Sequence, residues 1–208
     1  MRKNLAETLR LMLVTDDRLL AGRDLAEVCR AAVRGGVTVI QLRLKEATPA
    51  ELVAQLRRLK AALKVPVLVN DRLDVALAGG ADGVHLGPDD VPVPMARRLA
   101  PPGFLIGASV GTATEVENGR EADYWGVGPY RETGTKSDAG AALGPDGIRR
   151  VIGRADGKPC VAIGGVRSAD VGDLLKAGAA GVAVVSGILG AADIAMAARS
   201  YALPLQRG

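Results

Sequence analysis

The chain has 208 residues, which suits one compact domain and is short for a full eight-fold barrel. Apolar residues make up 48% of it, but only one Trp, three Tyr and one Phe are present, so the core must consist mainly of Val, Leu, Ile and Ala. The net charge of +4, without a long basic run, argues against a nucleic-acid partner and suits a local anion site.

The cysteines and the N-terminus point to a reducing compartment. Cys29 and Cys160 lie far apart and match no metal or redox spacing, so we expect two buried thiols. Met1 to Arg10 carry charges and no apolar core, which excludes a signal peptide, and no apolar run approaches the ~20 residues of a membrane span. We therefore expect a soluble, cytoplasmic protein with no membrane partner, and a homo-oligomeric state stays open.

Short apolar runs alternate with helical patterns along the whole chain. The strands are predicted at 11–15, 37–43, 66–70, 83–86, 104–109, 124–128, 160–164 and 182–186. The helices are predicted at 25–34, 49–63, 74–78, 94–99, 113–121, 145–154, 169–176 and 189–201. This order predicts an α/β fold, a single (β/α)₈ TIM barrel over residues 1–208, with 1–10 as an N-terminal extension or short helix.

A weak internal repeat supports the barrel. The segments AVRGGVTVIQL, ALAGGADGVHL and LKAGAAGVAVV each run from a helix end through Gly into a strand. A doubly wound open sheet is the alternative, and it would favour a Gly-rich turn after the first strand. That turn instead reads TDDR (15–18), so the barrel is preferred.

In such barrels the chemistry lies at the carboxyl ends of the strands, and the second strand ends in QLRLK (41–45). Alternation places Ile40, Leu42 and Leu44 on the face that packs against the helices. The opposite face points into the barrel mouth and carries Val39, Gln41, Arg43 and Lys45. Two cations in a confined pocket favour an anion such as phosphate, although a solvent-facing basic edge is the alternative.

Carboxylates follow the next two strands. Asn70 and Asp71 end the third strand, and Asp89 and Asp90 follow the fourth. Asp71 and one of the later aspartates could hold a single Mg²⁺, because that ion takes one or two carboxylates and completes its shell with water and substrate phosphates. Alternatively, each aspartate caps the helix that follows it.

Two further segments suggest anion binding. The loop from Gly128 to about Gly144 is the longest and carries Thr133, Thr135 and Lys136, although a plain surface loop is the alternative. The last two strands end in IGG (163–165) and VSG (185–187), where barrels often bind phosphate through backbone N–H groups. The sequence therefore offers one anion site on strands two to four and another on strands seven and eight.

His85 is the only histidine in the chain. A Ser-His-Asp site could use no other base, and metal sites with several histidines are excluded. We interpret His85 as a packing or hydrogen-bonding residue of the fourth strand.

These residues belong to motifs through which nearly the whole chain resembles the thiamine phosphate synthase family. The motifs are LVTD (13–16), QLRLK (41–45), ND (70–71), ADGVHLGPDD (81–90), GASV (107–110), ADYWGVGP (122–129), TGTK (133–136), AIGGV (162–166) and AVVSGI (183–188). The resemblance implies a Mg²⁺-dependent transferase of thiamine biosynthesis. Such an enzyme joins 4-amino-2-methyl-5-hydroxymethylpyrimidine diphosphate to 4-methyl-5-(2-phosphoethyl)thiazole and releases diphosphate.

The resemblance also implies a role for each matching residue. The pyrimidine diphosphate would be bound by Gln41, Arg43, Lys45, Asn70, Ser109 and Lys136. The thiazole phosphate would be bound by Thr133, Gly134, Thr135, Gly165, Val185 and Ser186. Asp71 and Asp90 would hold Mg²⁺, while Arg43, Lys45 and Lys136 would act catalytically by stabilising charge on the departing diphosphate. The family's scheme, ionisation followed by capture of the cation, needs no strong general base.

The chain departs from the family pattern at two places. Gly111 stands where many relatives, and the related thiazole tautomerases, carry His, which argues against a tautomerase. Arg131 and Glu132 replace the usual aromatic-proline lead into the threonines, so the fit of that loop is open. A tautomerase-like barrel enzyme and a non-catalytic phosphate sensor stay as alternatives; the sensor should have lost the aspartates or Lys136.

Overall fold

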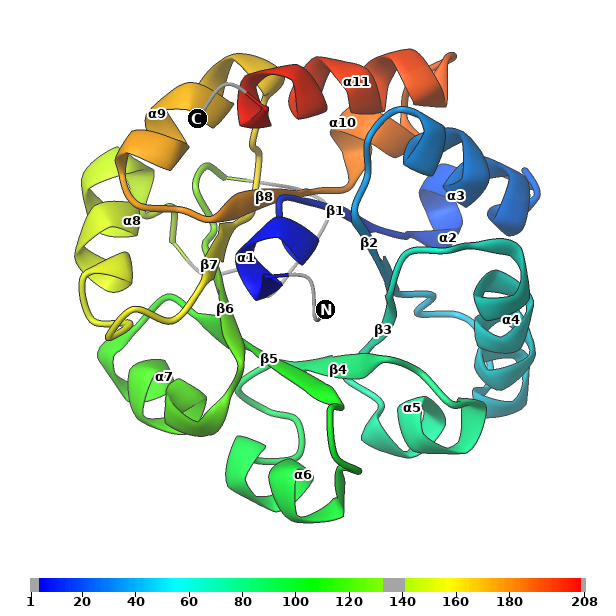
Figure 1. Cartoon of the computed structure of the whole chain (residues 1–208), viewed down its shortest axis with the longest axis horizontal. Coiled ribbons are helices and arrows are strands. Elements are labelled where there is room, and N and C mark those ends of the chain that lie inside the picture. Colours follow the sequence, from blue (N-terminus) through cyan, green and yellow to red (C-terminus); the bar gives the residue numbers. More distant parts are fainter. Residues whose placement is uncertain (1–3, 133–140, 207–208) are drawn as a thin grey trace.

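A computed structural model of the chain describes residues 4–132 and 141–206, and in it eight parallel strands close into a barrel in chain order (Figure 1). The strands are β1 (Leu11–Val14), β2 (Val39–Leu42), β3 (Val67–Asn70), β4 (Gly83–Leu86), β5 (Leu105–Val110), β6 (Tyr124–Val127), β7 (Cys160–Ala162) and β8 (Gly181–Val184). The ring is completed by β8 beside β1, with Leu11 opposite Val182. The predicted barrel and all eight predicted strands are confirmed.

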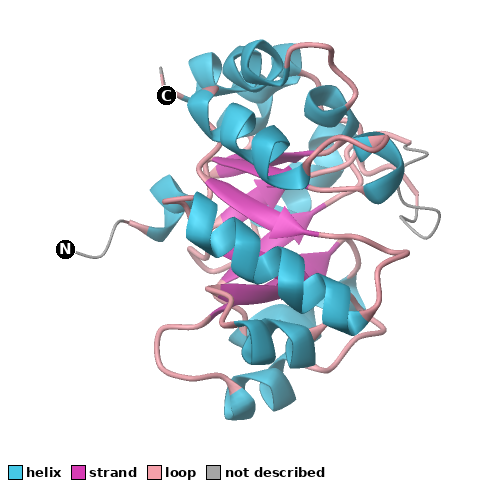
Figure 2. Ribbon diagram, turned by 90° about the vertical axis from the view of Figure 1, so that its right-hand side faces the viewer, coloured by secondary structure: helices cyan, strands magenta, loops and turns pink. Residues whose placement is uncertain are grey.

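Helices follow the strands and surround them (Figure 2). They are α1 (Leu5–Thr8), α2 (Asp17–Leu20), α3 (Leu25–Arg34), α4 (Pro49–Ala62), α5 (Leu73–Gly79), α6 (Val93–Leu99), α7 (Ala113–Asn118), α8 (Gly144–Ile152), α9 (Val171–Lys176), α10 (Ser186–Leu189) and α11 (Ile194–Leu205). Two short 3₁₀ helices, Gly119–Glu121 and Ser168–Asp170, overlap the helices predicted at 113–121 and 169–176.

The single helix predicted at 189–201 is wrong, because the structure has two helices there. The first, α10, begins at Ser186, directly after the last strand, and ends at Leu189. The second, α11, begins anew because the Asp193 side chain caps it by accepting from the N–H of Met196. Helix α2 was also not expected, since it is only one turn long.

Local sequence explains where the longer helices begin. Thr48 and Glu51 form a reciprocal capping box ahead of α4, with Pro49 in its first turn. Thr112 and Glu115 form the same box ahead of α7, and Asp24 caps α3 by accepting from the N–H of Glu27. These caps satisfy backbone donors at the points where the chain leaves the barrel mouth.

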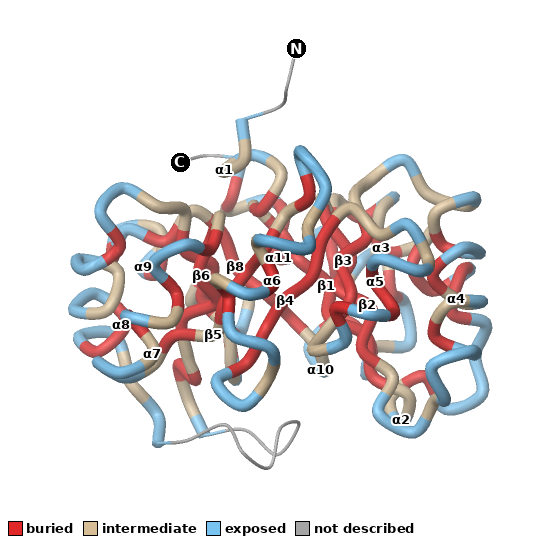
Figure 3. The backbone as a smooth tube through the Cα atoms, turned by 90° about the horizontal axis from the view of Figure 1, so that it is seen from below, coloured by how far each residue is buried: buried red, intermediate tan, exposed pale blue. Residues whose placement is uncertain are grey.

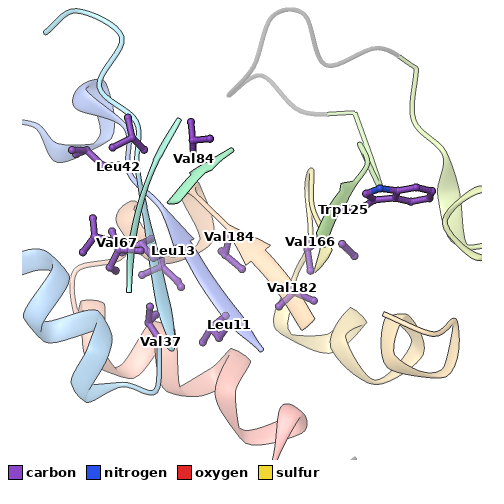
Figure 4. Packing of buried hydrophobic residues seen from close by; sticks show 14 of the residues in the cluster. Leu11, Leu13, Val37, Leu42, Val67, Val84, Trp125, Val166, Val182 and Val184 are labelled. Atoms are coloured by element: carbon purple, nitrogen blue, oxygen red, sulfur yellow. The ribbon is translucent and has the colours of Figure 1, made fainter. Parts of the chain in front are cut away.

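Apolar side chains pack in two layers, one between barrel and helices and one inside the barrel. Figure 4 shows members of the outer layer, among them Leu11, Leu13 and Val184. The predicted faces of β2 are confirmed, because Ile40 and Leu42 belong to this outer layer. The inner layer consists of Leu9, Met12, Val14, Val39, Leu68, Tyr124, Val161 and Ala183.

The two ends of the barrel differ. Helix α1, a short helix within residues 1–10, lies over the centre of one end, as the view along the barrel shows (Figure 1). The buried residue that follows, Leu9, joins the inner layer. In Figure 3, α2 and α10 lie at the opposite end, where the strands finish. The chemistry-bearing residues gather at that end.

Candidate active site

A cavity of about 200 Å³ opens at the carboxyl ends of the strands. Its lining includes most of the predicted site residues that the structure describes, namely Gln41, Arg43, Asn70, Ser109, Gly165, Val185 and Ser186. A second cavity of about 620 Å³ adjoins it, since Arg43, Gly165 and Ser186 line both. Lys45 lines the second cavity. Residues predicted for each of the two anion sites thus line the same pair of adjoining cavities, whereas Asp71 and Asp90 line neither of them.

The three polar side chains of QLRLK differ in depth. Gln41 and Arg43 are buried, whereas Lys45 is exposed at the outer cavity. The Gln41 amide donates to the sulfur of Met12 at 3.4 Å inside the barrel. Because Arg43 is buried and lines a cavity, the alternative of a solvent-facing basic edge is wrong for this residue.

Two residues at the end of β1, Thr15 and Asp16, hold Arg43 and were not predicted as site residues. The Thr15 hydroxyl accepts from the N–H of Arg43 at 2.8 Å and lies 3.1 Å from its carbonyl oxygen, to which it donates. The Asp16 carboxylate accepts from Nη1 of Arg43 at 2.8 Å. Thr15 and Asp16 are polar residues between a strand end and a helix start, the same signal that identified Asn70 and Asp71.

The carboxylates proposed for Mg²⁺ are not the N-cap residues of the helices that follow them. The N-cap residues are Arg72 for α5 and Pro92 for α6, and neither of them makes a side-chain capping hydrogen bond. Asp90 instead accepts from the N–H of Gly87 at 2.6 Å within its own loop. Asp71 directly follows β3 and has a φ of +63°, a left-handed conformation that is uncommon for residues other than Gly and is concentrated at functional positions.

The donor chemistry at this edge fits Mg²⁺. Among residues 4–132 and 141–206, no three His, Cys, Asp or Glu side chains gather to form a protein-only metal site. Two carboxylates on adjacent loops are a usual protein contribution to a Mg²⁺ that binds through substrate phosphates. Asp89, which precedes Asp90 in the sequence, lines the first cavity.

His85 lies inside the barrel and makes hydrogen bonds on both sides of its ring. Its Nδ1 lies 3.0 Å from the hydroxyl of Tyr124, and its Nε2 lies 3.1 Å from the hydroxyl of Ser109. Burial raises the pKa of Tyr124 far above its usual value, so this phenol stays protonated. The predicted hydrogen-bonding role of His85 is confirmed, and it connects the core to a residue that lines the cavity.

The glycines after β7 serve a packing need that the sequence did not reveal. Gly164 and Gly165 have φ values of +92° and +65°. A Cβ on Gly164 would lie 2.6 Å from Cα of Pro129, and one on Gly165 would lie 2.9 Å from Cβ of Arg131. The glycine pair therefore lets the loop after β6 pack directly on the loop after β7.

Arg131, one of the departures from the family pattern, ties these two loops together. Its Nη2 donates to Oδ1 of Asp170 at 2.7 Å and its Nη1 donates to the carbonyl of Gly165 at 3.2 Å. Its guanidinium carbon lies 4.4 Å from the ring centroid of Tyr130, in cation–π contact. The predicted site residues that follow, Thr133, Gly134, Thr135 and Lys136, lie outside the described residues.

Gly111, the other departure, lies where two loops approach closely. A Cβ at this position would lie 2.7 Å from the carbonyl oxygen of Gly128. The N–H of Gly111 donates to Glu115, the same carboxylate that forms the capping box of α7, at 2.6 Å. A histidine here would require that the backbone around Gly128 move.

None of the described helices combines the length and the apolar character that crossing a membrane requires.

Both cysteines are free and buried, as expected, and burial raises the pKa of each thiol to about 12.

Comparison with known proteins places this geometry in a family. The family model described as thiamine monophosphate synthase matches residues 11–188. A thiamine-phosphate synthase from Methanospirillum hungatei is 47% identical over 198 residues, covering 92% of this chain and 95% of that protein. One from Xanthobacter autotrophicus is 49% identical over 197 residues, covering 92% and 93%.

Solved structures agree with this result. A thiamine phosphate pyrophosphorylase from Pyrococcus furiosus superposes with a TM-score of 0.86 at 36% identity, covering 98% of each chain. A 3-hexulose-6-phosphate synthase, at 19% identity and a TM-score of 0.69 over 94% of this chain and 99% of the other, shares the fold. With the family model, the relatives and the predicted motifs in agreement, the chain belongs to the thiamine monophosphate synthase family.

Proposed function

We propose that the chain is a thiamine phosphate synthase, a transferase that joins the pyrimidine diphosphate to the thiazole phosphate and releases diphosphate. The single observation that carries the proposal is the family match over residues 11–188. The two adjoining cavities at the strand ends support it, because residues predicted to bind each of the two substrates line them. The tautomerase alternative is not favoured, since Gly111 replaces its histidine.

The reaction breaks one C–O bond and forms one C–N bond. The pyrimidine methylene loses its diphosphate, which leaves with the bonding electron pair, and the thiazole nitrogen then donates its lone pair to the methylene carbon. Negative charge grows on the leaving diphosphate, so the enzyme must supply positive charge there rather than a strong base.

We assign that positive charge to the basic residues of the mouth. Arg43 and Lys45, which follow β2, would contact the diphosphate oxygens together with Lys136, while Gln41, Asn70 and Ser109 would bind the pyrimidine. Asp71 and Asp90 would hold Mg²⁺, which supplies further positive charge next to the diphosphate. Thr133 to Thr135, Gly165, Val185 and Ser186 would bind the thiazole phosphate. A cytoplasmic location and a homo-oligomer stay predictions.

Turnover with both substrates tests the proposal directly. The purified chain, incubated with pyrimidine diphosphate, thiazole phosphate and Mg²⁺, is expected to yield thiamine phosphate, and a chelator is expected to stop the reaction. Absence of product with Mg²⁺ or any other divalent metal would overturn the proposal in favour of a sensor.

Three neighbouring aspartates test the metal assignment. We expect Asp71→Ala and Asp90→Ala to lower kcat by about 100-fold or more, because each removes a ligand of a charge-stabilising ion. Asp89→Ala is the matched control and should change kcat far less, although Asp89 precedes Asp90 in the sequence and lines the first cavity. Near-wild-type turnover of Asp71→Ala at saturating Mg²⁺ would remove that residue from the site.

A further inference from the structure

The ion pair between Asp16 and Arg43 is unusual within the part of the chain that the structure describes. Nη1 of Arg43 lies 2.8 Å from Oδ2 of Asp16, and each side chain is only 9% exposed. In the pair between Lys60 and Asp82, by comparison, both side chains are about one-third exposed. Burial of a charged pair carries a desolvation cost, so stability alone is a weak reason for its presence.

Asp16 is itself held in place by the backbone. Its Oδ1 accepts from the N–H of Leu19 at 3.2 Å and so caps α2, while its Oδ2 accepts from Arg43. One carboxylate therefore joins the start of a helix to a guanidinium on the neighbouring strand. Its orientation is fixed before any ligand binds.

The main chain and the guanidinium of Arg43 are held by two adjacent residues, Thr15 and Asp16. Thr15 brackets its main chain with two hydrogen bonds, and Asp16 holds its guanidinium. Strands β1 and β2 pair directly, with Val14 opposite Gln41, which brings this segment beside Arg43. The side chain thus has little freedom to rotate away from the mouth.

The guanidinium lies where it can serve two cavities, since Arg43 lines both. The contact through Nη1 engages one of the five N–H donors of a guanidinium, whose planar fork matches phosphate oxygens. Gly165 and Ser186 also line both cavities, so Arg43 shares its cavities with residues predicted to bind the second phosphate.

We propose that Asp16 is a positioning residue, which fixes the Arg43 guanidinium between the two cavities so that it contacts the departing diphosphate. Asp16 acts through Arg43 and does not itself contact substrate. This inference rests on the proposed function, because it names a further residue for that same reaction.

A double-mutant cycle tests whether Asp16 acts through Arg43. We expect Asp16→Asn and Arg43→Gln each to lower kcat/KM for the pyrimidine diphosphate by about 10-fold to 100-fold, the range of one charge-assisted hydrogen bond. The double variant should be about as active as the weaker single variant, because both changes remove the same contact. Losses that multiply in the double variant would overturn the proposal, as would an Asp16→Asn enzyme within twofold of wild type.

Capping must be separated from positioning. Asp16→Asn and Asp16→Ser both keep an N-cap acceptor for α2, and Ser is too short to hold Arg43, so both should fold and lose activity. Asp24→Asn is the matched control, since Asp24 also caps a helix and pairs with an arginine, Arg58, that is half exposed. An activity loss in Asp24→Asn equal to that in Asp16→Asn would assign the effect to stability and overturn the proposal.

Binding of inorganic diphosphate gives a second readout without turnover. Calorimetry with Mg²⁺ on wild type, both single variants and the double variant is expected to show the same non-additive loss of affinity. Additive losses would overturn the pairing. If wild type makes no thiamine phosphate, the proposed function fails, and this binding cycle still decides whether Asp16 positions Arg43 toward an anion.

Discussion

The two ends of the barrel are built for different purposes. At the amino end, α1 covers the opening and Leu9 is fully buried in the inner apolar layer. At the other end, the strands and the residues directly after them carry the buried polar residues of the described chain, which are Thr15, Asp16, Gln41, Arg43 and His85. The amino end contributes apolar burial, and the carboxyl end accepts the cost of buried polar groups for its chemistry.

Positive φ values occur at both ends of the barrel. Asp71, Gly164 and Gly165 lie after β3 and β7 at the carboxyl end, whereas Gly36 and Gly178 lie ahead of β2 and β8 at the amino end. What separates the two ends is the kind of side chain that is buried there, so substitutions at the two ends should affect different measurements.

Leu9→Ala should have the largest effect on stability. Removal of a fully buried leucine leaves a cavity that α1 and the strands cannot readily fill, so the free energy of unfolding should fall by about 2–5 kcal/mol. Urea denaturation measures this loss, and kcat per folded molecule should not change. Leu203→Ala is the control, since Leu203 on α11 is 43% exposed and should cost far less. A fall in kcat without a loss of stability would contradict the division between the ends.

The fold was predictable because its signals are local and repeated. Alternating apolar runs and helix starts placed all eight strands, and the alternation within β2 identified which side chains face the interior. The helix predicted at 189–201 failed because Ser186, Gly190 and Asp193 create a stop and a new start without interrupting the apolar pattern. Such a break depends on capping contacts that periodicity does not detect.

The site was predictable residue by residue but not in its connections. Arg43 and Gln41 were placed at the mouth by strand alternation, yet their partners come from other strands. The bond from His85 to Tyr124 joins residues 39 positions apart, and no sequence spacing reports it. Gly164 showed the same limit, since its φ and its contact with Pro129 are tertiary properties.

Gly126→Ala should disturb the carboxyl end specifically. A Cβ at this position would lie 2.8 Å from Cε1 of His85, so the ring must turn and weaken its bonds to Ser109 and Tyr124. We expect a loss of about 1–3 kcal/mol in the free energy of unfolding together with a fall in kcat. Both are measured on the same protein, by denaturation and by turnover.

The matched control for Gly126→Ala is Gly172→Ala. Gly172 lies in α9, where a Cβ would meet no atom within 4 Å, so alanine should stabilise the helix by up to about 1 kcal/mol. Turnover should stay at the wild-type level. Unchanged kcat in Gly126→Ala would mean that His85 supports the core and not the site.

The smallest effect is expected at the ion pair between Arg131 and Asp170, here called the clasp. The hydrogen bond from Arg131 is the main cause that holds the pKa of Asp170 below its usual value. A lowered pKa in the folded state stabilises the fold above the unfolded pKa of about 3.9, and this contribution is lost as pH falls through the folded pKa. Because Arg131 is 38% exposed, the contribution should stay below about 1 kcal/mol.

Asp170→Asn tests that sign. Urea unfolding of wild type and variant at pH 7, 5 and 3 should show a small stability difference at pH 7 that shrinks toward pH 3. Asp173→Asn serves as the control, because both side chains of the pair between Asp173 and Lys176 on α9 are exposed. If acid instead widened the difference for Asp170→Asn, the clasp would not act through its charge. A small contribution to the free energy of unfolding that is lost in acid would mean that ion pairs at the carboxyl end stabilise the fold little. Their role would then be to hold Arg131 and Arg43 in position.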